Sequence, residues 1–600
     1  MNPYRAPVAD MRFVMTELAG LEEVAALPGF ADATPDTVVA ILDEAAKFAT
    51  GVLDPLNRVG DREGARLDAD GSVVTPPGFR DAYRQFCELG WNGLAKNPDF
   101  GGQGMPHLVA APVDEMWNAT NMSFELCPML TAGAVEAIEL NGSDALKQAF
   151  LPKMVSGEWT GTMNLTEPQA GSDLAAVRTR AVPQGDGTYR LHGNKIFITY
   201  GDHDYTDNIV HLVLARTPDA PPGTKGISLF VVPKRLVNAD GSLGARNDVR
   251  CVSLEHKLGI HASPTAVLAF GDAGGAVGYL VGEENRGLEY MFVMMNLARF
   301  GVGMQGVGIA ERAYQLASDY ARERVQGRAA GLPRDAEAAG IVGHPDVRRM
   351  LMTMRACTEA GRALGYVTAA ALDVAHRHPD AATRTRELAF AELMIPVVKG
   401  WGTEMAQKVA YLGVQIHGGM GFVEETGAAQ YARDARITTI YEGTTGIQAN
   451  DLVVRKIVRD EGAALGAAVA RARAIERELD GARDEALAVI GARLRGGVDA
   501  LVDAARFAVA TYRTDPRSVL AGAVPLLELA GIVFGGAQLA RGASIAAQKL
   551  AGGEGDASFM RAKIATARHF AEHLLTQAPG LRDTVAAGAP SVLALADSEL

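Results

Sequence analysis

The chain has 600 residues, of which 48% are hydrophobic and 22% are charged. This balance is typical of a soluble globular protein and excludes a fibrous or disordered one, and the length predicts three or four structural units at about 100–200 residues each. The formal net charge of -13 would repel a phosphate backbone, and no run of Lys and Arg marks a basic face, so nucleic acid is disfavoured as a partner.

We expect a cytoplasmic protein without a metal site or a membrane span. The four cysteines occur singly, at Cys87, Cys127, Cys251 and Cys357, so there is no C-x-x-C pair for a metal or a redox couple. Charged residues interrupt the first thirty positions, which therefore lack the apolar core of a signal peptide. The most membrane-like stretch, Ala521 to Ala540, contains Pro525 and Glu528 and is typical of a packed soluble helix.

The pattern along the chain predicts helices, then strands, then helices. After an extension at 1–34, residues 35–158 form a helical region, in which Pro35 to Leu53 shows helical spacing of apolar residues. Residues 159–281 form a β-domain with strands at Tyr189 to Ile198, Asn208 to Ala215 and Gly226 to Val232, separated by turn clusters.

Helical spacing returns in residues 282–460 and continues in an Ala-rich appended domain at 461–600, whose expected role is packing or assembly. The predicted fold class is therefore mainly α with a central β-domain and an extra C-terminal helical domain.

Gly301 to Gly306 matches the dinucleotide pattern G-x-G-x-x-G. That fingerprint requires a preceding strand, whereas Leu288 to Phe300 and Ala310 to Arg324 both show helical spacing. We therefore interpret these glycines as sites of close helix packing and disfavour a nicotinamide enzyme.

A second segment, Met163 to Asp173, reads M-N-L-T-E-P-Q-A-G-S-D and opens the β-domain with hydroxyls, backbone donors and small residues. These are the groups that approach a flat cofactor and its phosphates. Taken alone, the segment is more typical of a capped turn, because Thr, Ser and Asp in loops usually satisfy their own backbone.

Four blocks in order carry a resemblance to a known family. Met163 to Asp173 resembles the T-E-P-x-A-G-S-D motif of the acyl-CoA dehydrogenase family, and Lys195 to Thr199 looks like its flavin-side strand. Gln415 to Gly421 resembles its Q-x-x-G-G-x-G loop, and Ile440 to Thr444 resembles its Y-E-G-T catalytic turn. The resemblance covers roughly residues 35 to 460.

This resemblance implies an FAD enzyme with a helical N-domain, a β-barrel middle domain and a helical bundle. In the family, FAD lies between the middle domain and the bundle. The cofactor-binding residues implied are Leu165, Thr166, Ser172, Phe197, Thr199, Arg324, Gln415, Gly419 and Thr444. In the family, the pair that matches Gln415 and Gly419 comes from a neighbouring subunit, so a homo-oligomer, a dimer or a tetramer, is implied.

The implied reaction is α,β-dehydrogenation of an acyl-CoA, with Glu442 as the base. An α-proton beside a thioester is weakly acidic, so the base must be desolvated while the β-hydride leaves to the flavin. The substrate-binding residues implied are Ser172, Arg299, Glu442 and Gly443. Some branches of the family place the base at the residue just before the arginine that corresponds to Arg299. In this chain that preceding residue is Ala298, which has no carboxylate.

The alternative role for Glu442 is a first-turn glutamate of the following helix, around Gly446 to Val458, favoured by the macrodipole. Thr445-Gly446 and the long Gly327 to Pro345 stretch depart from the family pattern, so flavin contacts there are not carried over. His261 and His417 receive no role, since a lone histidine is more often structural.

The N-terminal and C-terminal extensions resemble those of a bacterial subgroup of the family with long chains. That subgroup includes enzymes that oxidise 3-methylthiopropanoyl-CoA. A short or medium fatty acyl-CoA remains open, because side chains that the sequence does not place set pocket depth. The resemblance implies electron-transfer flavoprotein as the electron acceptor. One alternative is an oxidase that uses oxygen. The other is a DNA-binding flavoprotein of the same fold. DNA binding would require a basic face on the C-terminal domain, which instead mixes Arg with Asp and Glu throughout.

Overall fold

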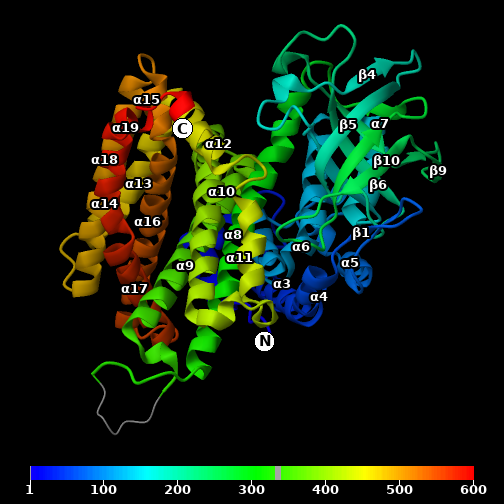
Figure 1. Cartoon of the computed structure of the whole chain (residues 1–600). Helices are drawn as coiled ribbons and strands as arrows, with labels where there is room; N and C mark the ends of the chain where they lie inside the picture. Colours follow the sequence, from blue (N-terminus) through cyan, green and yellow to red (C-terminus); the bar gives the residue numbers. More distant parts are fainter. Residues whose placement is uncertain (1, 332–338) are drawn as a thin grey trace. The chain divides into compact units, whose positions relative to one another are not determined.

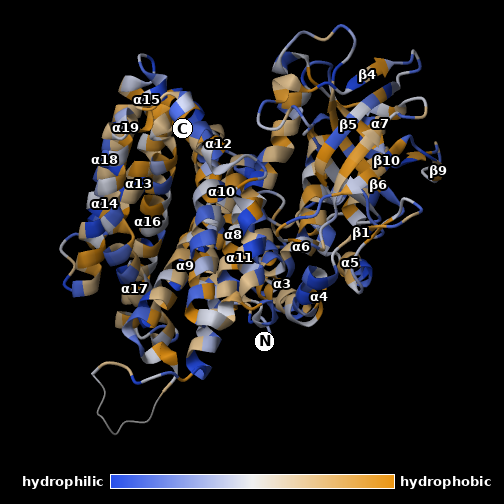
Figure 2. Ribbon diagram, in the orientation of Figure 1, coloured by the Kyte–Doolittle hydropathy of each residue, from blue (hydrophilic) through white to orange (hydrophobic). Residues whose placement is uncertain are grey.

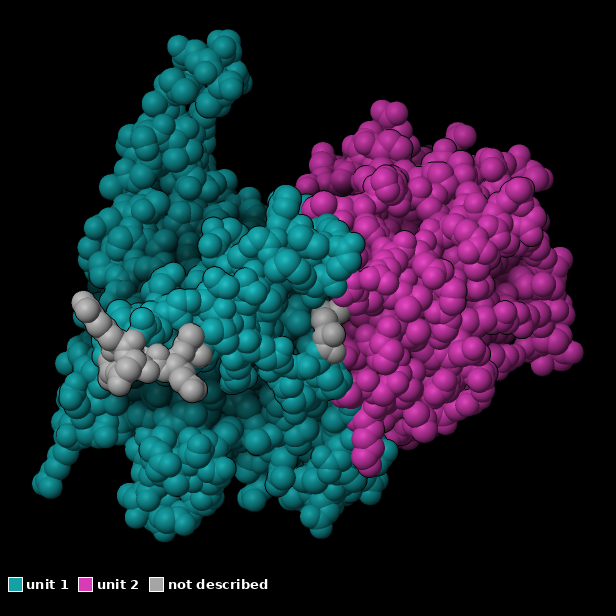
Figure 3. Space-filling model, turned by 60° about the horizontal axis from the view of Figure 1, so that its bottom comes forward, with its two compact units in different colours: residues 1–46, 106–119, 302–600 teal, residues 47–105, 120–301 magenta. Residues whose placement is uncertain are grey.

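The computed structural model describes residues 2–331 and 339–600. Two compact units, coloured separately in Figure 3, make up the chain. Unit 1 comprises Met1–Ala46, Pro106–Ala119 and Val302–Leu600, and unit 2 comprises Lys47–Met105 and Thr120–Gly301. The predicted fold class, mainly α with a central β-domain and further helices at the C-terminus, is confirmed.

Unit 2 contains an eight-stranded sheet (Figure 1). Its strands are β3 (Trp159–Asn164), β4 (Arg180–Pro183), β5 (Tyr189–Thr199), β6 (Asn208–Ala215), β7 (Ser228–Pro233), β10 (Val249–Leu254), β11 (Thr265–Phe270) and β12 (Ala276–Leu280). The order is β10-β11-β5-β12-β7-β6-β3, with β4 paired to β5. Only the β3–β6 pair within this sheet is parallel. The three predicted strands coincide with β5, β6 and β7 to within two residues.

Strand β6 is apolar throughout because both of its faces are covered. Val210, Leu212 and Leu214 belong to one buried cluster, and the alternate residues Val213 and Ala215 belong to another. Side chains alternate between the two faces of a strand, so a strand buried on both faces has a nearly continuous apolar sequence.

Unit 2 also contains helices. They are α4 (Asp54–Glu63), α5 (Phe79–Glu88), the second part of α6 (His107–Asn141), α7 (Asp144–Ser156) and the first part of α8 (Gly287–Glu323). Residues of α6, α7 and α8 pack against one face of the eight-stranded sheet. Helix α6 is interrupted at Asn121, whose φ of -159° and ψ of 81° are not helical. The Phe124 N–H donates to Asn121 Oδ1 at 3.1 Å, so this side chain caps the second half of the helix.

Unit 1 is helical. Its elements are α1 (Val8–Phe13), α2 (Leu21–Ala25), most of α3 (Pro35–Phe48), the second part of α8, α9 (Pro345–Arg377), α10 (Ala381–His417), α11 (Ala428–Thr438), α12 (Thr445–Asn450), α13 (Ala463–Leu479), α14 (Glu485–Thr511), α15 (Pro516–Ala521), α16 (Ala523–Gly552), α17 (Ala557–His573), α18 (Ala578–Ala587) and α19 (Ala589–Val592). Helices α16 and α17 pack against α9, so the appended residues share a core with the bundle.

The G-x-G-x-x-G pattern lies inside α8, so helix, rather than a strand, leads directly into it. A Cβ on Gly303 would lie 2.5 Å from Val398 Cγ1, and a Cβ on Gly306 would lie 2.7 Å from the Gly402 carbonyl oxygen. These glycines allow α8 and α10 to approach closely, which confirms the packing interpretation.

Helix α16 is long and apolar enough to cross a membrane and is mostly orange in Figure 2. However, 78% of its most apolar window is buried inside the protein. Burial of this kind is typical of the core helix of a soluble protein, as the sequence predicted.

Candidate active site

Residues 440–444, the 440–444 turn, join α11 to α12 in unit 1 and carry Glu442. Glu442 has φ 55° and Gly443 has φ 91°, so two successive residues are left-handed. A glutamate there is strained by about 1–2 kcal/mol, since its Cβ approaches the following carbonyl. A Cβ on Gly443 would lie 2.7 Å from Gln448 Nε2, so glycine is required.

Two side chains hold the carbonyl groups of this turn. Lys399 Nζ, on α10, donates to the Gly443 carbonyl at 2.6 Å. Gln448 Nε2, on α12, donates to the Glu442 carbonyl at 2.9 Å. Both side chains are completely buried.

Tyr441 anchors the turn from the side of α8, because its hydroxyl donates to Gln305 Oε1. Burial raises the pKa of Tyr441 far above its ordinary value, and the Glu442 carboxylate adds to the rise. The phenol is therefore neutral and remains the donor in its hydrogen bond to Gln305.

Glu442 is not in the first turn of the following helix. Thr444 is the N-cap of α12, and the Ile447 N–H donates to its Oγ1 at 3.2 Å. The alternative role of Glu442 as a first-turn residue is therefore wrong. Thr444, which we predicted as a cofactor contact, has a capping role in this structure.

In unit 2, a buried ion pair holds the loop at residues 163–173. Lys195 Nζ lies 2.8 Å from Glu167 Oε1 and donates to the Leu165 carbonyl at 2.9 Å. Thr179 also donates to Glu167, through its N–H at 3.0 Å and its hydroxyl at 2.6 Å. The Ile196 N–H donates to the Thr166 carbonyl at 3.0 Å, which fixes this loop to β5.

The pKa values of both partners are lowered, but for different reasons. Burial opposes ionisation of Glu167, but the Lys195 ammonium outweighs it and lowers the pKa of that carboxyl to about 2. Burial lowers the pKa of Lys195 to about 8, although Glu167 opposes this shift. At neutral pH both groups are charged.

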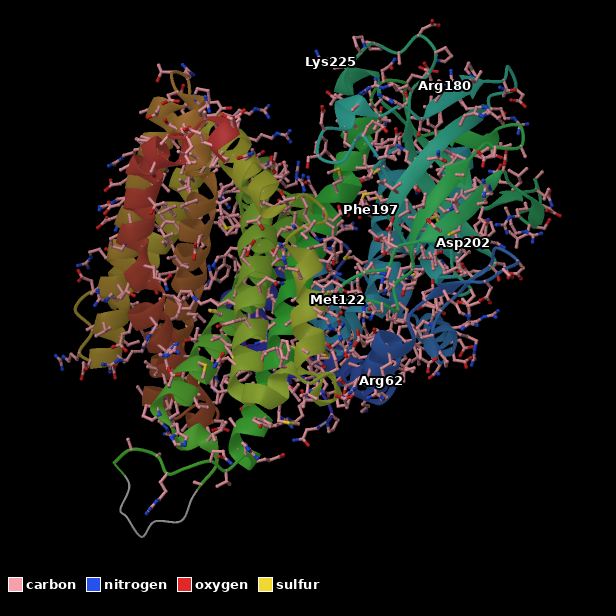
Figure 4. All side chains as sticks on the ribbon, in the orientation of Figure 1. Arg62, Met122, Arg180, Phe197, Asp202 and Lys225 are labelled. Carbon is pink, nitrogen blue, oxygen red and sulfur yellow. The ribbon has the colours of Figure 1, made fainter. Side chains whose placement is uncertain are left out.

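Phe197 lies near the end of β5 (Figure 4), with φ 58° and 58% of its surface exposed. The pairing with β11 shifts register here, so that Ile196 and Phe197 face Val267 alone. Bulges of this kind redirect a side chain and occur often beside active sites. An exposed aromatic ring held in a strained conformation is a platform for a flat ligand.

Unit 2 also carries the polar residues that the sequence predicted at the site. Thr166 and Thr199 are half-buried and Ser172 is exposed. Over residues 2–331 and 339–600, the hydroxyls of these three residues make no hydrogen bond to the protein. Arg299, in the same unit, is buried, and its Nη1 lies 3.5 Å from Asn296 Oδ1, a long contact.

Unit 1 carries the remaining predicted cofactor residues. Arg324 follows α8 and is exposed, and its guanidinium has no ion-pair partner in the described part of the chain. Gln415 is exposed near the end of α10. Gly418 has φ 60°, and no atom lies within 4 Å of a Cβ built on Gly418 or Gly419. The long stretch at Gly327 to Pro345 lies partly outside the described residues, at 332–338.

The two histidines without a predicted role make structural contacts. The ring nitrogens of His261 lie 2.8 and 2.9 Å from the carbonyls of Asp61 and Lys257. His417 Nδ1 lies 2.7 Å from the Gly413 carbonyl, its ring stacks on Tyr320, and burial lowers its pKa.

Sequence reasoning missed Lys399, Gln448 and Gln305 as neighbours of the 440–444 turn. The signal for Lys399 was a single cation within the apolar stretch Leu393 to Trp401. A lysine on the buried side of a helix needs a polar partner, so this residue predicts a hydrogen-bond acceptor close to α10.

Four family models match the chain. Those described as acyl-CoA dehydrogenase N-terminal, middle and C-terminal domains match residues 35–158, 162–273 and 285–457. A model described as acetyl-CoA dehydrogenase C-terminal like matches residues 463–596.

Similar proteins span nearly the whole chain. The 3-methylmercaptopropionyl-CoA dehydrogenase of Ruegeria pomeroyi is 52% identical, over 96% of each chain. The butyryl-CoA dehydrogenase of Syntrophomonas wolfei is 37% identical, over 97% of this chain and 96% of the relative. An acyl-CoA dehydrogenase from Bacillus anthracis, solved with FAD, has the same fold, with a TM-score of 0.73 at 21% identity, over 98% of this chain and 92% of that one.

Proposed function

Since the chain belongs to the acyl-CoA dehydrogenase family and is an FAD-dependent enzyme of that type, we propose that it oxidises 3-methylthiopropanoyl-CoA, with Glu442 as the base. The main support for this substrate is the 52% identity, over 96% of each chain, to the Ruegeria enzyme. The 3-methylmercaptopropionyl group in the name of that enzyme is the same acyl group as 3-methylthiopropanoyl. A short straight-chain acyl-CoA is the second candidate, favoured by the likeness to a butyryl-CoA dehydrogenase.

The residues present fit FAD. The exposed Phe197 ring suits the flat isoalloxazine, and the hydroxyls of Thr166, Ser172 and Thr199 suit its polar edge. The Arg324 guanidinium suits a diphosphate, and the open space at Gly419 admits close approach of a ligand to the main chain. When bound, FAD accepts the hydride from the β-carbon.

We assign proton removal to Glu442, whose carboxylate takes the α-proton. Its backbone N–H donates to the thioester oxygen and so stabilises the enolate as negative charge develops there. Gly443 admits the thioester to the turn. Arg299 and Ser172 bind the substrate.

We further propose a cytoplasmic homo-oligomer, a dimer or a tetramer, in which Gln415 and Gly419 serve the adenosine half of a neighbouring subunit's cofactor. Exposed apolar residues beside this loop support self-association, namely Met420, Phe422 and Val423. Members of the family pass electrons to electron-transfer flavoprotein, which we take as the acceptor here.

The test is an anaerobic titration of the purified holoenzyme, followed by flavin absorbance. The substrates are 3-methylthiopropanoyl-CoA and its isostere pentanoyl-CoA, in which a methylene replaces the sulfur, with butyryl-CoA and octanoyl-CoA as length controls. We expect the thioether substrate to bleach the flavin with the highest kcat/KM, and Glu442→Gln to abolish bleaching. Because one methylene changes selectivity by ~10–200-fold, a clear preference for butyryl-CoA would overturn the substrate proposal. Activity retained in Glu442→Gln would overturn the assignment of the base.

A further inference from the structure

We propose that Lys399 is a positioning residue for proton removal: its ammonium holds the Gly443 carbonyl and thereby the backbone that aims the Glu442 carboxylate. The inference rests on the proposed function, because it concerns the same base. It gives a role to the buried ammonium of Lys399, which takes no part in the proton transfer or the hydride transfer.

The 440–444 turn needs an external support. Glu442 and Gly443 are both left-handed, and a glutamate adopts this conformation only where its surroundings enforce it. Relaxation of Glu442 to an ordinary φ would rotate its Cα–Cβ bond and carry the carboxylate away from its position.

Lys399 provides a support that is both charged and rigidly placed. It lies inside α10, its side chain is completely buried, and its Nζ is 2.6 Å from the Gly443 carbonyl oxygen. Charged donors form shorter and stronger hydrogen bonds than neutral ones. Burying an ammonium is costly, and the hydrogen bond to the Gly443 carbonyl offsets part of that cost. The Lys399 side chain is therefore held at this carbonyl.

Gln448 supports the same turn from a second helix. Its Nε2 lies 2.9 Å from the Glu442 carbonyl oxygen and 3.4 Å from that of Gly443. Its buried Oε1 has no hydrogen-bond partner among the residues that the structure describes. The Gln448 side chain therefore acts only as a hydrogen-bond donor, and its Nε2 contacts the carbonyl oxygens of both Glu442 and Gly443.

These contacts fix the direction of the base through the peptide planes. The Glu442 carbonyl belongs to the peptide on the C-terminal side of Glu442, and the Gly443 carbonyl belongs to the next peptide. Holding both sets ψ of Glu442 and the conformation of Gly443. A misplacement of about 1 Å at a reacting group can cost ~10²-fold in rate.

The experiment isolates proton removal from oxidation. In 3-thiapentanoyl-CoA a sulfur replaces the β-carbon, so no β-hydride can leave, while the α-proton remains acidic. Glu442 then takes the α-proton, exchanges it with solvent and returns a deuteron in D2O. The rate of deuterium uptake at the α-carbon is measured by NMR with the FAD-loaded enzyme, as a function of pH.

Four variants are compared with the wild type. Lys399→Met keeps the length of the side chain but removes the donor and the charge, and Lys399→Arg restores the charge. Lys408→Met removes an exposed lysine of the same helix and is the matched control. Glu442→Gln defines the rate without the base. Flavin content and Tm are recorded for each.

We expect Lys399→Met to retain FAD and to slow exchange by ~10²-fold. Its exchange profile should move towards higher pH, because the ammonium that binds the carbonyl of the adjacent residue, Gly443, is lost. Lys399→Arg should recover part of the rate, and Lys408→Met should match the wild type. A wild-type rate and pH profile in Lys399→Met would overturn the inference, provided that Glu442→Gln abolishes exchange.

Exchange that persists in Glu442→Gln would instead overturn the proposed base, and the inference with it. If Lys399→Met does not fold, Gln448→Met tests the same support from the other helix, with an expected loss of ~10-fold. An unchanged rate in that variant would overturn the claim that the held carbonyls aim the base.

Discussion

Lys563 and Asp10, which are 553 positions apart, form a buried ion pair with 2.5 Å between Nζ and Oδ1. Lys563 also lies 2.7 Å from Glu359 Oε2, and Arg362 lies 2.7 Å from the other oxygen of Asp10. Arg362 extends the network to Glu115 and Glu311. One connected set of charges thus joins α1, α6, α8, α9 and α17 within unit 1.

Loss of Lys563 should destabilise unit 1 strongly. Lys563→Met leaves Asp10 and Glu359 buried with one cation fewer, and breaking a buried pair costs about 3–5 kcal/mol. Urea unfolding should show this loss. Arg561→Met, an exposed change on the same helix, should change stability by less than about 0.5 kcal/mol. Equal effects of the two changes would contradict a structural role for the network.

Asp373 should make stability fall as pH rises. Its oxygens accept the N–H groups of His107 and Leu108 at 2.8 and 2.9 Å, but burial dominates and raises its pKa from 3.8 to about 7. A raised pKa means that the folded state holds the proton more tightly. The contribution to stability is therefore full below about pH 3.8 and is lost as pH rises to about 7.

The comparison for this prediction is Asp373→Asn, which cannot ionise. Between pH 5 and pH 8.5 the wild type should lose stability relative to the variant, by an amount on the order of a few kcal/mol in chemical unfolding. Parallel pH curves for the two proteins would show that Asp373 does not take up a proton on folding.

Phe197→Ala should weaken FAD binding with little loss of stability, because the ring is 58% exposed within its unit. Aromatic stacking contributes about 0.5–1.5 kcal/mol, so the Kd for FAD should rise by ~2–10-fold. Fluorescence titration of the apoprotein measures this change, and Phe197→Trp should retain the affinity. A loss of stability equal to the loss of affinity would mean that Phe197 is a packing residue.

Glu442→Gly should abolish turnover and should be more stable than the matched variant Glu442→Ala. Glycine adopts φ 55° without the strain of a Cβ, so Glu442→Gly should be more stable than Glu442→Ala by about 1 kcal/mol. Both variants lose the carboxylate equally. A more stable alanine variant would show that the left-handed conformation carries no strain.

The sequence predicted much of the fold because its signals are local. Strand β6 was located to the residue from an apolar run, and the helical spacing on both sides of Gly301 to Gly306 correctly excluded a dinucleotide fold. Lys195 lay inside a recognised block, but its bond to the Leu165 carbonyl needs β5 and the loop together in space.

Contacts between distant helices have no local signal. Nothing near Asp10 in the sequence indicates Lys563, and nothing near Glu442 indicates Lys399. Capping was misjudged for the same reason: the helix after Glu442 begins one residue after Thr444, so the glutamate lies before the cap rather than in the first turn. The choice between Thr444 and Glu442 depends on backbone angles that the residue types do not determine.

The pairing of Asp10 with Lys563 also constrains how the protein is made. At about 5–20 residues per second, a ribosome needs roughly half a minute to two minutes to synthesise the residues between them. During that time the segment around Met11, Phe13 and Val14, which is buried in the finished protein, lacks part of its partners. The nascent chain therefore exposes an apolar N-terminal segment for almost its entire synthesis, and chaperones that shield this segment should govern the yield of folded enzyme.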